Sequence, residues 1–168
     1  MGKGLLSRLQ SYFSASFGGR YVEYLIKETI EEQPKLATLL FGVKRFDTLQ
    51  VEYRFQVGSQ TRIADLAFFY AETERPTCLV EIKYDDHKNP KNAAQLEHYL
   101  KFCQKQNCKF IVLSQHLLPE DLRKKLPNRE TLMLFSDLAD KLKNSEGSMG
   151  GLLRRFFVDR GLVMHKFE

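Results

Sequence analysis

The hydrophobic and polar positions of the chain change their period several times, and each change predicts a different element. Over residues 20–33, apolar side chains recur every three or four positions, which predicts a helix that ends before Pro34. Residues 50–57 alternate strictly between apolar and polar, which predicts a half-buried strand. The predicted inward face of this strand consists of Val51, Tyr53, Phe55 and Val57.

Two more strands are predicted directly after the first. Gly58, Ser59 and Gln60 predict a turn, so we expect residues 50–57 and 62–70 to form a β-hairpin, followed by a third strand over 77–84. The remaining elements are predicted as helices over 92–106, 119–125 and 136–143 and as strands over 109–114 and 131–135. A run of strands followed by alternating helices and strands predicts an α/β domain with a central mixed sheet flanked by helices.

Length and composition place these elements in one domain. The chain has 168 residues, of which 43% are hydrophobic and 28% charged, and this excludes a wholly disordered or fibrous protein. We expect a domain over 1–143, a flexible linker over 144–151, and a tail over 152–168. The tail is apolar enough that it should pack on its own domain, on a second copy or on a partner protein.

Several other classes of protein are excluded or disfavoured by the sequence. No apolar run approaches the ~20 residues of a membrane span, so we expect no membrane partner. The amino-terminal segment has no apolar core of a secretory signal. Three cysteines without zinc-ligand spacing favour free thiols and a cytoplasmic location.

Charged residues interrupt two of the predicted strands, at Asp65 and at Glu81 with Lys83. Side chains alternate along a strand, so Glu81 and Lys83 should share a face, with Asp65 on a neighbouring strand about 4.8 Å away. Two carboxylates form a hard oxygen site that suits Mg²⁺ or Mn²⁺ better than zinc. The alternative is a structural one, in which Asp65 and Lys83 form a buried salt bridge.

This pattern resembles the PD-(D/E)XK nuclease superfamily, whose restriction-endonuclease-like fold has an αβββαβ core. The name-giving proline is replaced by Ala64, a position that provides no ligand. Gln95 and Tyr99 lie four residues apart on the next helix and resemble the QxxxY motif of the RecB-like branch. The resemblance implies that Gln95 and Tyr99 support the site or the nucleic-acid backbone.

The resemblance also implies a metal site and a reaction. Asp65 and Glu81, with the main-chain carbonyl of Ile82, would bind Mg²⁺ or Mn²⁺, and Lys83 would be the catalytic lysine. The expected reaction is hydrolysis of phosphodiester bonds, with DNA as the expected substrate, by a metal-bound water. The alternative is a catalytically inactive module of the same fold that binds nucleic acid or a protein partner.

The resemblance allows a further carboxylate from the first helix. Glu23 is the first candidate and Glu28 the second. Glu23 lies at the margin of the apolar stripe of the helix, so a solvated residue on the flank is an open alternative.

The charge of the chain suits a polyanionic partner. The formal net charge is +5, and Lys88, Lys91 and Lys101 fall near the proposed site, where they could contact phosphates. A lysine-rich helix face can also be simply solvated. The neighbouring residues Asp86 and His87 lie in a polar loop and are expected to be solvated as well.

Overall fold

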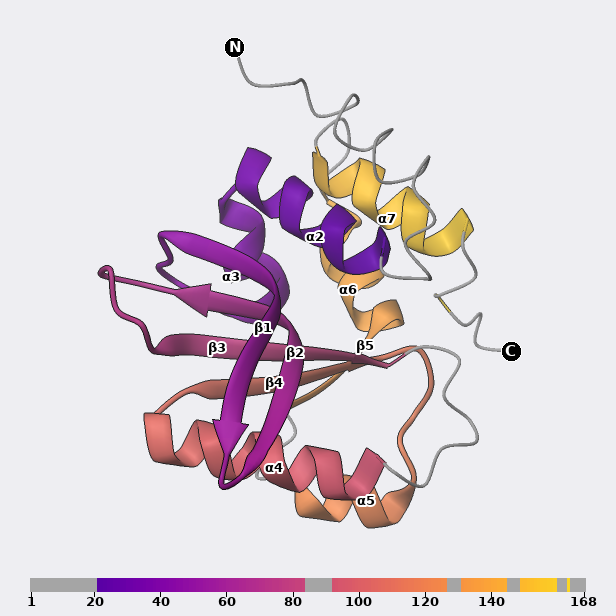
Figure 1. The fold of residues 1–168 in the computed structure, drawn as a ribbon. Helices are drawn as coiled ribbons and strands as arrows, with labels where there is room; N and C mark the ends of the chain where they lie inside the picture. Colours follow the sequence, from indigo (N-terminus) through magenta and orange to yellow (C-terminus); the bar gives the residue numbers. More distant parts are fainter. Residues whose placement is uncertain (1–20, 84–91, 127–130, 145–148, 160–162, 164–168) are drawn as a thin grey trace.

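A mixed β-sheet between two layers of helices forms the core of the protein (Figure 1). The computed structural model describes residues 21–83, 92–126, 131–144, 149–159 and 163. One face of the sheet is covered by α2 (Tyr21–Glu32), α3 (Lys35–Phe41), α6 (Phe135–Leu142) and α7 (Met149–Asp159). The other face is covered by α4 (Asn92–Gln106) and α5 (Glu120–Lys125). The predicted α/β class, with a mixed sheet flanked by helices, is confirmed.

The five strands follow one another across the sheet in chain order. They are β1 (Thr48–Val57), β2 (Gln60–Phe69), β3 (Pro76–Lys83), β4 (Lys109–Ser114) and β5 (Leu132–Leu134). The first three strands pair antiparallel through short turns, whereas β3, β4 and β5 pair parallel. The parallel pairing follows from the connections, because α4 carries the chain from β3 back to the start of β4.

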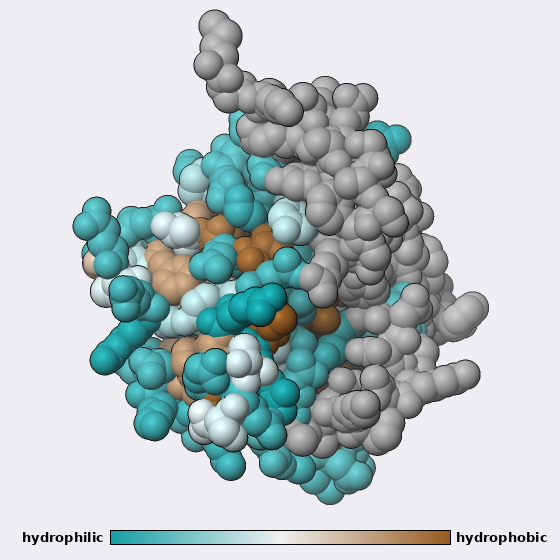
Figure 2. Space-filling model, in the orientation of Figure 1, coloured by the Kyte–Doolittle hydropathy of each residue, from teal (hydrophilic) through white to brown (hydrophobic). Residues whose placement is uncertain are grey.

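Two apolar cores form, one on each face of the sheet. Leu66, Phe68 and Val80 point to the side of α2, whereas Ala67 and Leu79 point to the side of α4. Alternate side chains of β2 and β3 thus fill opposite cores, as expected for central strands. Figure 2 shows that the described part of one face is mostly hydrophilic, with a band of apolar side chains across its middle.

The first strand does not keep a single inward face. Leu49 and Val51 pack in the core next to α2, whereas Tyr53, Phe55 and Val57 pack in the core next to α4. The predicted face of Val51, Tyr53, Phe55 and Val57 is therefore wrong. Between the two groups lies Glu52, whose φ of 58° is left-handed and turns the later side chains to the opposite side. The outer half of the hairpin consequently bends towards α4 (Figure 1).

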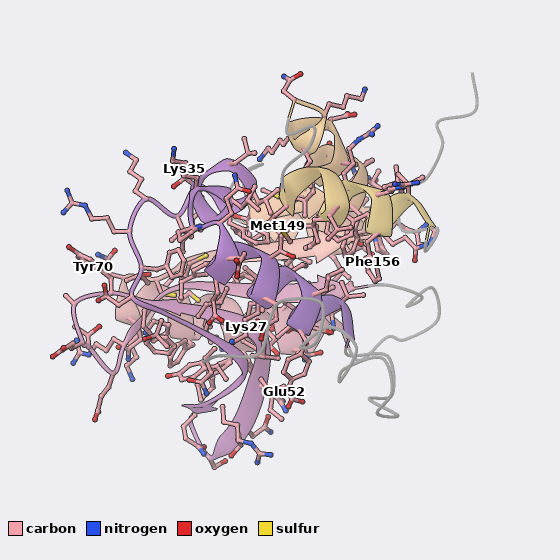
Figure 3. The ribbon with its side chains drawn as sticks, turned by 90° about the horizontal axis from the view of Figure 1, so that it is seen from above. Lys27, Lys35, Glu52, Tyr70, Met149 and Phe156 are labelled. Atoms are coloured by element: carbon pink, nitrogen blue, oxygen red, sulfur yellow. The ribbon has the colours of Figure 1, made fainter. Side chains whose placement is uncertain are left out.

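The structure also contains two helices that the pattern did not predict. Pro34 precedes α3, and since proline fits the start of a helix it separates two helices instead of ending the helical region. The second helix, α7, begins at Met149, inside the stretch expected as a linker. Its Leu153 and Phe157 are buried, and Figure 3 shows α7, with Met149 and Phe156, beside α2. The described part of the tail thus packs on its own domain.

Smaller differences concern the ends of elements. The predicted strand over 131–135 is shorter, because Phe135 already begins α6. Leu134 is the N-cap of α6, and Asp137, in the first turn, accepts a hydrogen bond from its amide through Oδ2 at 2.9 Å. Within the described residues, no helix has the length and apolar character that a membrane crossing requires.

Candidate active site

The candidate site lies where β2 and β3 separate, at the carboxyl end of β3. The antiparallel pairing of these strands reaches Leu66 and Val80 and goes no further towards Asp65 and Glu81. In place of a strand carbonyl, Asp65 Oδ2 accepts a hydrogen bond from the amide of Ile82 at 2.6 Å. The pairing of β2 with β3 has ended at this point, so the Asp65 carboxylate takes the place of a strand carbonyl as the acceptor for this main-chain amide.

Glu81 and Lys83 share a face of β3, as their spacing predicts. Lys83 Nζ lies 3.0 Å from Glu81 Oε1. Gln95 of α4 contacts both side chains, because its Oε1 accepts from Lys83 Nζ and its Nε2 donates to Glu81 Oε1, each at 3.4 Å. The amide of Gln95 thus fixes the relative positions of the carboxylate and the ammonium group.

Tyr99 connects this cluster to the bent hairpin. Its hydroxyl donates to the carbonyl of Ile63, two residues before Asp65, and accepts from Gln95 Nε2 at 3.1 Å. The ring is fully buried and stacks on Phe110, with ring centroids 5.4 Å apart. Because Tyr99 contacts both the hairpin and Gln95, it holds α4 and β2 in the positions that bring the site together.

The electrostatics of the cluster centre on Glu81. Burial and the neighbouring charge of Asp65 raise the pKa of the Glu81 carboxyl group to about 8, although Lys83 lowers it. Burial is the largest of these causes. When two carboxylates lie close together in a buried place, it is unfavourable for both to be ionised at once. A cation between them would offset that cost.

The residues present fit a divalent cation with few protein ligands. Glu81 Oε2 is buried and makes no hydrogen bond, although it belongs to a carboxylate next to Asp65. Within the described ranges, no group of three or more His, Cys, Asp or Glu side chains could hold a metal ion. Magnesium commonly takes one or two carboxylates and keeps several waters, so a pair of carboxylates is sufficient for it.

Glu23 and Glu28, the two predicted candidates from the first helix, are both buried. Both lie in α2, which packs on the face of the sheet opposite to α4, and both are buried, with 5% and 4% of their surface exposed. The alternative that Glu23 is a solvated flank residue is therefore wrong. The contribution of Glu23 to the site stays a prediction.

The structure describes only some of the lysines that are predicted to contact nucleic acid. Lys101 lies exposed on α4. Lys88 and Lys91, as well as Asp86 and His87, lie outside the described residues. The contacts of these lysines with phosphates stay predictions.

One pair of side chains next to the site is not predicted by the sequence patterns. Arg62 of β2 donates through Nε to His98 Nδ1 of α4 at 2.9 Å. His98 directly precedes Tyr99, and Arg62 directly precedes Ile63, so this pair lies beside the hydrogen bond of Tyr99 to the hairpin. A scan of the helix for polar residues on the face of Gln95 would have found His98, but its partner depends on the bend of the hairpin.

Fold and site together define an α/β domain with a buried acidic centre and a lysine at the carboxyl end of a parallel strand pair. A family model described as Type I restriction enzyme R protein N terminus matches residues 41–131, which is more than half of the chain. The chain belongs to this family. The matched segment contains Asp65, Glu81, Lys83, Gln95 and Tyr99. Comparison with curated proteins and with solved structures found no match.

Proposed function

We propose that this domain is a metal-dependent nuclease that hydrolyses phosphodiester bonds in DNA. The observation that carries the proposal is the convergence of Asp65, Glu81 and Lys83 at the carboxyl end of β3. Ligands of α/β sheets typically bind at this end of the strands. Membership in a family named after a restriction enzyme subunit supports a role in cutting DNA.

The proposal includes a place in the PD-(D/E)XK superfamily, in its RecB-like branch, with the restriction-endonuclease-like fold. The support is the contact of Gln95 with Tyr99, four residues later on α4, and of Gln95 with the two charged groups of β3. A helix that carries these two residues on one face beside the sheet is what the QxxxY motif requires.

Asp65 and Glu81, with the carbonyl of Ile82, would hold Mg²⁺ or Mn²⁺. A divalent cation supplies a water of lowered pKa and offsets the negative charge that develops on the phosphate. The buried Oε2 of Glu81 favours such an ion, since a buried carboxylate oxygen without a hydrogen bond is costly.

The protein's own groups would bind and orient the substrate. Lys83 Nζ is held by Glu81 and Gln95, while 11% of the side chain is exposed, so its ammonium group can meet a phosphate oxygen at the surface. Gln95 keeps the ammonium in place and Tyr99 keeps Gln95 in place. In the proposed reaction Lys83 stabilises the phosphate oxygens, and the other two residues are positioning residues.

The test combines cleavage with a metal-binding readout. Purified protein is incubated with Mn²⁺ and linear, circular, single-stranded and branched DNA. We expect Lys83→Ala and Glu81→Gln to lower the cleavage rate by at least about 10²-fold, because each removes a group that acts in the transition state. Lys35→Ala, a change of an exposed lysine in α3, is the matched control and should cleave like the unchanged protein.

The second readout is the melting temperature with and without millimolar Mg²⁺ or Mn²⁺. A bound ion should raise it in the unchanged protein and in Lys35→Ala, but not in Glu81→Gln. Cleavage that persists undiminished in Lys83→Ala and Glu81→Gln would refute the site. DNA binding without any cleavage would instead identify the domain as a catalytically inactive binding module.

A further inference from the structure

A guanidinium group is held beside the candidate site by a histidine and a glutamine. Arg62 donates through Nε to His98 Nδ1 at 2.9 Å and through Nη2 to Gln60 Oε1. Within the described part of the chain, no carboxylate contacts Arg62. Among the described residues, the guanidinium is therefore held in place by partners that are not carboxylates.

The place of this group relative to the site follows from the hairpin and from α4. His98 lies three residues after Gln95, so the two side chains are neighbours on the helix surface. Arg62 lies three residues before Asp65 in β2, which is a rise of about 10 Å in an extended strand. Arg62 thus lies beside the cluster of Asp65, Glu81 and Lys83, on the side of the bent hairpin.

The chemistry of the pair suits a phosphate group. A guanidinium has five N–H donors, and two of them are used by His98 and Gln60, so the others can serve a ligand. Arginine binds phosphate through pairs of N–H groups and keeps its charge at any accessible pH. Holding the side chain in advance also reduces the entropy lost when an anion binds.

We propose that Arg62, positioned by His98, binds a backbone phosphate of DNA beside the proposed site. This inference rests on the proposed function. The contact is sequence-independent, since it involves the backbone of the nucleic acid only.

A purely structural role for Arg62 makes different predictions. The hairpin is already joined to α4 by the hydrogen bond of Tyr99 to Ile63 and by the ring contact of Phe55 with Phe102, whose centroids are 4.4 Å apart. If Arg62 served only as another such link, its loss would lower the stability without changing the salt dependence of DNA binding. The two roles are therefore separated by measuring binding at several salt concentrations.

The experiment measures binding of a fluorescein-labelled DNA duplex in EDTA, so that no cleavage occurs. We expect Arg62→Gln to weaken binding about five- to tenfold at low salt, and to reduce the slope of log affinity against log salt by about one. Arg54→Gln is the matched control. Arg54 lies exposed in β1 of the same hairpin, and its loss should leave the slope within error of the unchanged protein.

Two further variants test the positioning by His98. His98→Ala keeps the charge of Arg62 but removes its support, so the slope should be retained while the affinity falls by a smaller factor. Arg62→Lys likewise keeps the charge and should retain the slope, but it loses the paired donors and should not restore the full affinity. Melting temperatures of all variants show whether the fold is intact.

Each outcome bears on the inference separately from the nuclease proposal. The inference is overturned if Arg62→Gln binds like the unchanged protein, if Arg54→Gln lowers the slope equally, or if the unchanged protein does not bind DNA in EDTA. A protein that never cleaves DNA, but loses affinity and slope only on Arg62→Gln, would overturn the nuclease proposal and leave the phosphate contact standing.

Discussion

Among single residues, Glu81 combines a cost for folding with the proposed metal site. The residue is 4% exposed, and burial together with the charge of Asp65 raises the pKa of its carboxyl group to about 8, well above the ordinary value of 4.5. Between these two pH values the unfolded chain has released the proton while the folded protein still binds it. The free energy of unfolding therefore falls as the pH rises through this range.

We expect Glu81→Gln to remove this pH dependence. In EDTA, the stability of the variant relative to the unchanged protein should increase from pH 5 to pH 8, by an amount on the order of 1.4 kcal/mol per pH unit for a fully shifted group. Urea denaturation at four pH values measures it. Glu74→Gln, at an exposed position, is the control. A stability difference that stays flat between pH 5 and pH 8 would contradict the raised pKa.

The sequence predicts which residues of the candidate site lie together where they belong to the same strand or the same helix. Glu81 and Lys83 share a face because strand side chains alternate, and Gln95 and Tyr99 share a face because they lie four residues apart on a helix. The hydrogen bond of Arg62 to His98 was not predicted, since these two residues lie 36 positions apart and in different elements. Only the path of the hairpin determines such a pair.

Among the elements, the β1–β2 hairpin decides whether the site comes together. Val51 and Tyr53 pair with Leu66 and Ala64, so the left-handed Glu52 lies opposite Asp65. The hairpin thus changes direction at the level of Asp65 and carries Ile63 to the hydroxyl of Tyr99. The strict alternation in the sequence did not predict this bend, because a hydrophobic pattern carries no information about the φ angle of a single glutamate.

Tyr99→Phe should separate the hairpin from α4 without emptying the core. The ring remains, but the Ile63 carbonyl and the Gln95 amide lose a partner, so we expect a loss of about 1–2 kcal/mol in the free energy of unfolding. Cleavage should fall as well, since Gln95 loses its support. Urea denaturation and the cleavage rate measure the two effects.

Tyr70→Phe provides the comparison for this change. Tyr70 is 38% exposed at the end of the hairpin, so the loss of its hydroxyl should alter stability by less than about 0.5 kcal/mol. Equal effects of the two substitutions would show that the hydroxyl of Tyr99 does not join the hairpin to the helix.

In the molecule as a whole, the carboxyl-terminal helix completes the core on the side of α2. Phe157 of α7 is fully buried, and its ring lies 5.1 Å from that of Phe135 in α6, edge to face. Glycine and serine before α7 suggested a linker, because composition describes flexibility and does not show where a following apolar stripe can pack. The helix is nevertheless an integral layer of this fold.

Phe157→Ala should therefore destabilise the whole domain. We expect a loss of about 3–5 kcal/mol, from lost burial and from the cavity that remains. Val158→Ala, at a neighbouring position with 38% exposure, should cost less than about 1 kcal/mol. Guanidinium denaturation of both variants provides the measurement, and equal losses would show that α7 does not belong to the core.

The hydrogen bond from the Ile82 amide to Asp65 gives this carboxylate a structural role that does not depend on the proposed metal site. Loss of Asp65 would deprive a main-chain amide of β3 of this acceptor, whether or not the domain cuts DNA. The presence of an aspartate at this position is therefore weak evidence for nuclease activity by itself.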